Sequence, residues 1–322
     1  MKLLDQFNLS GLSLSSKVIM APLTRRRCTR THVPVSIMVD YYAQRASAGL
    51  IIAEGCSPSV NGAGYANMPG LYNDAQKEAW IPITKAVHDK GGKIYLQVMH
   101  TGRVGHTNNL DDGAVILGPS AIAQEGELST YDFDKQPYTV PRAMTIAEIK
   151  TSVEEFANCC KLAIEAGFDG VELHSAHGYL PNQFLNESSN TRTDEYGGSI
   201  ENRMRFLLEV IKSSCQAIGS DKVALRVSPF SYADTKEKPT ELFRIYNALI
   251  NELNQLDLAY LHLSHMGDPN PEKFKLWKEL RANYNGTVML CGDFTKEKAE
   301  EALQNDAADL IAFGRDFIAN PD

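Results

Sequence analysis

The sequence alternates short aliphatic runs with longer amphipathic stretches over nearly its whole length. The short runs are mostly apolar and rich in β-branched residues, as is typical of strands buried on both faces. Such strands are predicted at residues 17–21, 50–54, 93–99, 170–174, 222–228, 258–263, 287–290 and 309–313. Helices are predicted near residues 34–48, 74–90, 146–166, 199–218, 240–255, 272–284 and 295–305.

Buried strands in strict alternation with helices favour an α/β fold, a closed (β/α)8 TIM barrel, over an open sheet. The stretch from His100 to Thr145 is rich in turn-forming residues and predicts a long functional excursion after the third strand. Glu148 stands three residues after Thr145, which predicts a capping box at the start of the third helix. No repeat or interdomain linker interrupts the pattern, so we expect a single domain over residues 1–322.

The end of the sequence departs from the barrel pattern. Fewer helices than strands are predicted, and Asn320-Pro321-Asp322 follow soon after the last strand. We therefore expect the last helix to be missing and the C-terminal part of the barrel to be truncated. The last strand and the faces of its neighbours would then lie uncovered, which costs about 25 cal/mol per Å² of exposed apolar surface.

Composition and charge exclude several classes of protein. With 43% hydrophobic and 22% charged residues among 322, the chain has the proportions of a folded protein. Its 40 acidic residues against 32 basic ones give a net charge of -8, which argues against nucleic acid as a partner. No apolar run is long enough to span a membrane, and the first residues form no signal-peptide core. We expect a soluble, cytoplasmic protein with no membrane partner.

A barrel of this kind gathers its chemistry where the strands end and the following loops begin. Each predicted strand is followed there by a side chain that can bind a ligand or move a proton, or by a glycine turn. In chain order these are Thr24, Glu54-Gly55, Gln97 and His100, His174 and His177, Arg226, His262 and His265, Gly292-Asp293, and Gly314-Arg315. Polar residues often end strands, so this pattern by itself does not identify an activity.

The densest group of such residues runs from His174 to Leu180. Two histidines three positions apart, His174 and His177, can converge on one small atom and donate N–H groups to a carbonyl oxygen. Tyr179 keeps its proton at neutral pH and is acid enough for a carbanion or an enolate, since an unperturbed tyrosine has a pKa of about 10. The two histidines could instead bind a zinc ion, but the sequence has no HExxH or Cys-x-x-Cys motif to support this, so no metal is expected. Two histidines hydrogen-bonded in the barrel rim are a further alternative.

Two glycine-containing turns predict a phosphate site. Gly292-Asp293 follows the seventh predicted strand and Gly314-Arg315 the eighth, where barrels often bind phosphate. Glycines let backbone N–H groups approach, and the Arg315 guanidinium would pair with the phosphate charge. The Asp293 carboxylate has the wrong charge for this role, so its backbone N–H is the expected contact.

Taken together, these residues resemble the old yellow enzymes, the FMN-dependent ene-reductases of the NADH:flavin oxidoreductase group. The resemblance runs over essentially the whole chain, and the order of its motifs makes it specific. Its landmarks are Ala21-Pro22-Leu23-Thr24-Arg25, Tyr41-Tyr42-x-Gln44-Arg45-Ala46, Gln97 to Arg103, His174 to Leu180, Asn186 to Asn190, Tyr196 to Ser199, Glu201-Asn202-Arg203, Arg226 to Pro229, and Phe313-Gly314-Arg315.

The resemblance implies an FMN that is bound tightly and non-covalently. The residues implied to bind it are Pro22, Leu23, Thr24, Gly55, Gln97, Arg226, Gly292, Asp293, Gly314 and Arg315. Of these, Thr24 would lie near the flavin C4 carbonyl, Gln97 would meet the pyrimidine ring, and Arg226 would place a positive charge near N1 and O2. The last four in the chain would hold the phosphate.

The resemblance also implies how an alkene is reduced. His174 and His177 would grip the carbonyl of an α,β-unsaturated substrate, flavin N5 would give a hydride to its β carbon, and Tyr179 would protonate the α carbon. The implied partners are NAD(P)H and small electrophilic alkenes, which would use one pocket in turn by ping-pong kinetics. The sequence contains no complete G-x-G-x-x-G motif, so a separate nicotinamide domain is not expected. A homodimer is possible, but the sequence does not decide the oligomeric state.

Two alternative functions stay open at this point. The chain could be the flavin-binding barrel of a dienoyl-CoA reductase or amine dehydrogenase type, although no iron–sulfur cysteine cluster occurs in it. It could also be a flavin-binding protein with impaired catalysis. Met99 stands where related enzymes often carry tryptophan, so we expect a roomier and softer substrate cavity.

Overall fold

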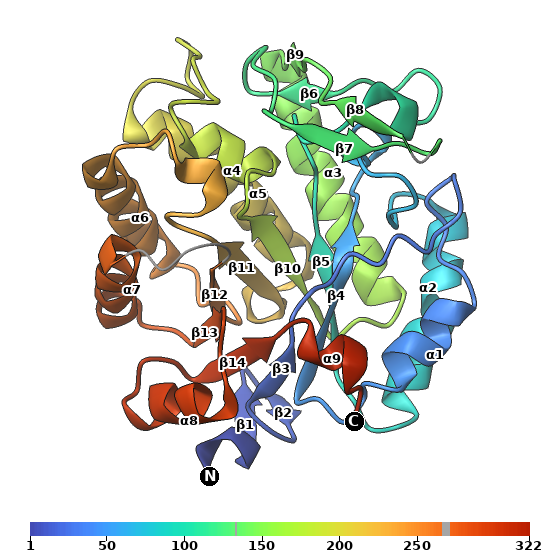
Figure 1. The fold of residues 1–322 in the computed structure, drawn as a ribbon, viewed down its shortest axis with the longest axis vertical. Coiled ribbons are helices and arrows are strands. Elements are labelled where there is room, and N and C mark those ends of the chain that lie inside the picture. Colours follow the sequence, from blue (N-terminus) through green and yellow to red (C-terminus); the bar gives the residue numbers. More distant parts are fainter. Residues whose placement is uncertain (133, 266–270) are drawn as a thin grey trace.

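Parallel strands of the described chain close into a barrel that helices surround (Figure 1). The computed structural model describes residues 1–132, 134–265 and 271–322. Around the barrel the strands are β3 (Val18–Met20), β4 (Leu50–Cys56), β5 (Ile94–Val98), β10 (Gly170–Ser175), β11 (Val223–Val227), β12 (Leu261–Ser264), β13 (Val288–Cys291) and β14 (Leu310–Phe313). The predicted α/β barrel is confirmed, and each predicted strand overlaps one of these.

The predicted helices that alternate with the strands are also present. They are α1 (Ile37–Ala43), α2 (Asp74–His88), α3 (Ile146–Glu165), α5 (Ile200–Ile218), α6 (Pro239–Leu253), α7 (Pro271–Asn283) and α8 (Lys296–Gln304). The capping box is confirmed, because Thr145 accepts from the Glu148 backbone N–H while Glu148 accepts from that of Thr145. Sequence analysis missed the shorter α4 (Leu180–Leu185) and α9 (Asp316–Ala319).

Alternate residues along the strands face into the barrel and form layers. The layer nearest the strand starts is apolar, and Tyr95 stacks on Tyr260 in it with ring centroids 5.9 Å apart. The next layer is polar. In the strand register, Glu172 of β10 is paired with Gln97 of β5 and His174 with Arg226 of β11. The polar side chains of the second layer therefore pack directly on the apolar layer.

An N-terminal hairpin of β1 (Phe7–Leu9) and β2 (Leu12–Leu14) closes the end of the barrel where the strands begin (Figure 1). Leu9 and Leu14 are both fully buried and pack with the apolar layer of the barrel interior. The opposite end, where the strands finish, is therefore the one open to ligands.

The excursion after β5 forms two small sheets over that opposite end (Figure 1). In one sheet β6 (Leu117–Gly118) pairs with β9 (Arg142–Ala143), and in the other β7 (Glu127–Ser129) pairs with β8 (Lys135–Pro137). The predicted excursion is confirmed. Short 3-10 helices complete the described elements: η1 (Lys2–Leu4), η2 (Val60–Gly62), η3 (Thr107–Asn109), η4 (Ser220–Lys222) and η5 (Tyr232–Asp234).

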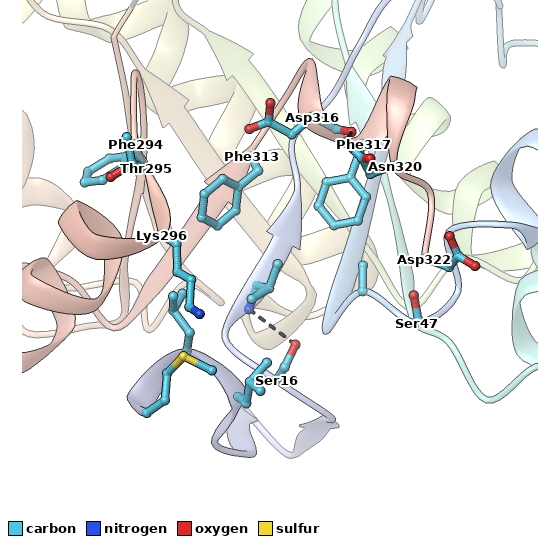
Figure 2. Close-up of a pocket in the computed structure, with 15 residues that line it drawn as sticks. Ser16, Ser47, Phe294, Thr295, Lys296, Phe313, Asp316, Phe317, Asn320 and Asp322 are labelled. Atoms are coloured by element: carbon cyan, nitrogen blue, oxygen red, sulfur yellow. Dashed lines mark hydrogen bonds between the residues drawn. The ribbon is translucent and has the colours of Figure 1, made fainter.

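The outer face of β3 and β14 borders an apolar pocket of about 480 Å³ (Figure 2). β14 pairs with β3, so the barrel itself is closed. Val18 of β3, Phe313 of β14 and Phe317 of the short α9, which follows the last strand, line the pocket. None of the predicted site residues lines it. In the part of the chain that the structure describes, no helix is long and apolar enough to cross a membrane.

Candidate active site at the barrel mouth

The predicted catalytic residues come together at the end of β10 and in the turn that follows it. His177 and Gly178 both have left-handed backbone conformations, with φ of 55° and 80°, so the chain turns sharply there. The turn is held by the His177 N–H, which donates to Ser228 Oγ at 2.7 Å, and by the Gly178 N–H, which donates to Asn182 Oδ1 at 2.8 Å. As a result the His174 ring lies 5.5 Å from that of His177 and 4.7 Å from that of Tyr179, between centroids.

Both histidines are neutral hydrogen-bonding groups. They are buried, and burial together with the neighbouring positive charge of Arg226 holds the pKa of each well below its ordinary value. His174 Nδ1 accepts a hydrogen bond from the Ala176 backbone N–H at 3.2 Å. Its proton therefore resides on Nε2, which leaves that nitrogen as a donor.

A serine that sequence analysis missed connects Arg226 to His177. Arg226 Nη2 donates to Ser264 Oγ at 2.8 Å, and the same oxygen lies 3.2 Å from His177 Nε2. A hydroxyl that accepts from a guanidinium can donate its own hydrogen to an imidazole nitrogen. The only sequence signal for Ser264 is its position two residues after His262, on the same inward face of β12.

A buried carboxylate underlies this group and was also missed. Glu172 is fully buried; its Oε1 accepts from Gln97 Nε2 at 2.8 Å and its Oε2 lies 2.7 Å from His262 Nδ1. Burial opposes its ionisation, but the contact with His262, the charge of Arg226 and the Gln97 hydrogen bond outweigh burial and lower the pKa of Glu172. Burial also lowers the pKa of His262, so Arg226 is the lasting positive charge near this carboxylate. His262, expected at the rim, is inside the barrel. A carboxylate accepts only, so the Gln97 amide nitrogen must face Glu172.

Tyr179 lies in a small cluster apart from the main core. It packs with Tyr65 against Ala63, Met68 and Met99, and the hydroxyls of the two tyrosines lie 3.2 Å apart. Burial raises the pKa of Tyr179 above its ordinary value, so the phenol is protonated at neutral pH. Met99 fills space beside Tyr179 and Gly55, where a Cβ on Gly55 would approach Met99 Cε to 2.6 Å. Tyr65 was not identified from the sequence.

A cavity of about 670 Å³ joins Arg226 to the two glycine turns. Its lining includes the predicted cofactor residues Pro22, Leu23, Arg226, Gly292, Asp293, Gly314 and Arg315. Thr24 in the loop after β3, Gly55 in β4 and Gln97 in β5 do not line this cavity, and Thr24 is exposed. The structure therefore brings most of the predicted cofactor residues together, along one continuous space.

This cavity fits a flat cofactor with a phosphate at one end. Its volume is in the range of small-molecule sites. Arg226 Nε is buried and makes no hydrogen bond to the described residues, so a donor is available toward an acceptor such as a ring carbonyl. At the other end, a Cβ built on Gly292 or Gly314 would meet protein atoms only at 3.4 or 3.5 Å, so protein atoms do not crowd the space beside these glycines, which line the cavity. Arg315 is exposed, and its Nη2 lies 3.9 Å from Asp293 Oδ1.

Glu54, at the end of β4, holds the loop that follows β3. Its Oε2 accepts from the Arg25 backbone N–H at 2.9 Å, and its Oε1 accepts from the Tyr42 hydroxyl at 3.2 Å. Burial raises the pKa of Glu54 to about 7, against the hydrogen bonds, which lower it. The cavity-lining residues Pro22 and Leu23 belong to the loop that this carboxyl anchors. Among the described residues, no group of three or more His, Cys, Asp or Glu side chains could hold a metal ion.

The chain is similar to several known proteins over its full length. Residues 2–322 match the family described as NADH:flavin oxidoreductase / NADH oxidase. A protein of Leishmania infantum described as a probable flavin mononucleotide-dependent alkene reductase is 42% identical over 317 residues, which cover 97% of this chain and 86% of that protein. The structure of the old yellow enzyme homologue from Zymomonas mobilis has a TM-score of 0.93 at 40% identity, covering 100% of this chain and 91% of that one. Morphinone reductase in complex with tetrahydroNAD has the same TM-score of 0.93 at 40% identity, covering 100% and 89%.

Proposed function

We propose how this chain works from the premise that it belongs to the old yellow enzyme family of NADH:flavin oxidoreductases. It is an FMN-dependent alkene reductase of that family. The proposal is that it reduces the C=C bond of small electrophilic alkenes, such as α,β-unsaturated carbonyl compounds, with NAD(P)H in ping-pong order. The tetrahydroNAD complex of morphinone reductase supports a nicotinamide as the reductant.

The 670 Å³ cavity would hold the cofactor along its length. Pro22 and Leu23 would line the ring system, Gln97 and Arg226 would meet the pyrimidine edge, and Thr24 and Gly55 would complete the ring site. The Gly292, Asp293 and Gly314 backbone and the Arg315 guanidinium would hold the phosphate. When bound, FMN supplies the hydride carrier between the nicotinamide and the alkene.

His174 and His177 would bind the carbonyl oxygen of the alkene substrate. Both are neutral, and His174 Nε2 carries its proton, so they can donate hydrogen bonds without bringing in a full charge. Negative charge develops on that oxygen as a hydride reaches the β carbon. Donors fixed in place where charge develops lower the barrier by roughly 3–4 kcal/mol each.

Tyr179 would supply the proton that completes the reduction. Its O–H bond breaks as a C–H bond forms at the α carbon, and the oxygen is left as a phenolate. A raised pKa makes Tyr179 a weak acid that reacts only with a strongly basic carbon, which protects the proton until the hydride has been transferred. Hydride and proton together account for the two hydrogens added across the double bond.

One observation carries this proposal. Two neutral buried imidazoles and a protonated phenol converge within one turn, with ring centroids 4.7 and 5.5 Å from the His174 ring. Carbonyl binding and proton donation would then occur side by side, next to Arg226, which lines the cavity. A histidine pair that served only the rim structure would not need a phenol beside it.

The test separates the two half-reactions of the FMN-loaded enzyme by stopped-flow absorbance. Tyr179→Phe should leave flavin reduction by NADPH unchanged and slow reoxidation by an enone about 100-fold, the usual contribution of a general acid. Tyr284→Phe, which removes a hydroxyl in the segment after α7, is the control and should leave both half-reactions at wild-type rates. Equal losses in both half-reactions would contradict the role of Tyr179. NADPH consumption that does not respond to any enone would indicate a flavin-binding protein with impaired catalysis.

A further inference from the structure

Tyr65 makes a direct contact with the proposed acid Tyr179. It belongs to the segment after η2, more than a hundred residues earlier in the chain, and its hydroxyl oxygen lies 3.2 Å from that of Tyr179. The rings meet edge to face, with centroids 6.2 Å apart and planes at 89°. Both side chains are half-buried. No role in the reduction described above uses this second phenol.

Arg26 adds a positive charge to the same pair. Its guanidinium lies 4.8 Å from the centroid of the Tyr65 ring, a cation–π distance. Arg26 comes from the loop after β3, where its φ of 53° is left-handed. Three separate segments of the chain therefore meet at the two phenols.

The pair answers a chemical need of the proposed reaction. After Tyr179 gives up its proton, a phenolate remains in a half-buried site, and it must be stabilised and then protonated again before the next turnover. A phenol O–H at hydrogen-bond distance does both, because it donates to the phenolate and can then transfer its proton. The His174 imidazole beside Tyr179 does not offer a second acidic proton, since it is neutral.

We propose that Tyr65 donates a hydrogen bond to the Tyr179 oxygen during proton donation and then passes its own proton to it. This inference rests on the proposed acid role of Tyr179. In the transfer the Tyr65 O–H bond breaks, the Tyr179 O–H bond forms, and water returns a proton to Tyr65; no electrons are exchanged. Arg26 stabilises the negative charge while it is shared by the two oxygens. Tyr65 is a positioning and relay residue, because it acts on the substrate only through Tyr179.

The first test is Tyr65→Phe in the FMN-loaded enzyme. Flavin reduction by NADPH should keep its wild-type rate, while alkene reduction in a single turnover should slow about tenfold, as expected for losing one hydrogen bond to a charged group. The solvent deuterium isotope effect on alkene reduction should increase. Tyr131→Phe is the matched control, because its hydroxyl contacts the backbone of Asn67 and Arg30 instead. It should leave rate and isotope effect unchanged.

The second readout is the pH at which Tyr179 loses its proton. The titratable and charged groups around Tyr179 are Tyr65, Tyr138, Arg26, Arg226 and His174. Of these, the Tyr65 hydrogen bond favours the phenolate, so its loss should move the alkaline fall of the alkene-reduction rate up by about one pH unit. Tyrosinate absorbance measures the same titration without turnover. The Tyr179 signal is identified as the one that is absent from Tyr179→Phe, and it should show the same upward shift in Tyr65→Phe. A merely structural contact would not move this titration.

Arg26 provides a second, independent variant. Arg26→Gln should move the titration up as well, and Arg26→Lys should restore it, because only the charge is restored. The proposal is overturned if Tyr65→Phe keeps the wild-type alkene-reduction rate and pH profile while Tyr179→Phe loses activity. The proposed function would then still stand. If Tyr179→Phe itself reduces alkenes normally, the acid role and the relay both fail.

Discussion

Glu172 shows how one buried side chain orients several functional groups. One carboxylate oxygen fixes the amide of Gln97 and the other contacts His262, while its charge offsets that of Arg226 two strand positions along. An unpaired charge in such a place would be strongly destabilising, so the Glu172 carboxylate and the Arg226 guanidinium have to be considered together. The charge that a bound ring system would experience is set by this balance.

A change at this residue should appear in the flavin reduction potential. Glu172→Gln removes the negative charge and leaves the positive charge of Arg226 less compensated, so reduced anionic flavin should be favoured. We expect the midpoint potential to rise by about 30 mV, the equivalent of about 1.4 kcal/mol for two electrons. Spectroelectrochemical titration measures it. Asp234→Asn alters another buried carboxyl, bonded to Asn186 and Ser231, and should leave the potential unchanged. A fall in the Glu172→Gln potential would contradict the assignment.

At the scale of elements, the loop after β3 depends on a carboxyl at the end of β4. Glu54 has a pKa of about 7, against an ordinary value of 4.5. The folded state therefore binds a proton more tightly than the unfolded state does. The contribution of Glu54 to stability is fully present below pH 4.5 and is lost as the pH rises through 7. The stability is lost because ionised Glu54 is a buried charge, a cost that its hydrogen bonds with Arg25 and Tyr42 offset only in part.

The variant Glu54→Gln tests this dependence because it cannot ionise. The difference in unfolding free energy between variant and wild type should shift by about 3 kcal/mol in favour of the variant between pH 5 and pH 8, from the size of the pKa shift. Urea denaturation at several pH values measures it. Glu148→Gln changes a half-buried carboxyl whose pKa is lowered by Arg142, so this variant should show no gain above pH 7. A pH-independent difference for Glu54→Gln would show that the carboxyl is ionised throughout.

Long elements were predictable from the sequence and short or non-local ones were not. The barrel strands are continuous apolar runs and the helices between them carry an amphipathic period, and α3 carries its own start signal at Thr145. The two- and three-residue strands over the mouth and the four-residue α9 carry no period. The glycine turns and the His174–Tyr179 turn were local, so they were found. The contacts of Tyr65 with Tyr179 and of Ser264 with Arg226 join distant segments, and no spacing in the sequence announces them.

At the scale of the whole molecule, the N-terminal hairpin is part of the barrel core. Leu9 is fully buried against the interior layer, whereas Leu4, five residues earlier, is 61% exposed. Leu9→Ala should lower the unfolding free energy by about 3 kcal/mol, the usual cost of a cavity at a buried leucine. Leu4→Ala should change it by less than about 0.5 kcal/mol. Urea denaturation compares them, and equal effects would show that the hairpin does not close the barrel.

The pairing of β3 with β14 has a consequence for how this polypeptide is made. β3 is the first barrel strand to leave the ribosome, and its neighbour β14 leaves almost three hundred residues later. Throughout synthesis one edge of β3 is therefore open to strands of other nascent chains. Closure must wait until translation has passed β14, and chaperones that shield open strand edges would act on this protein mainly before that moment.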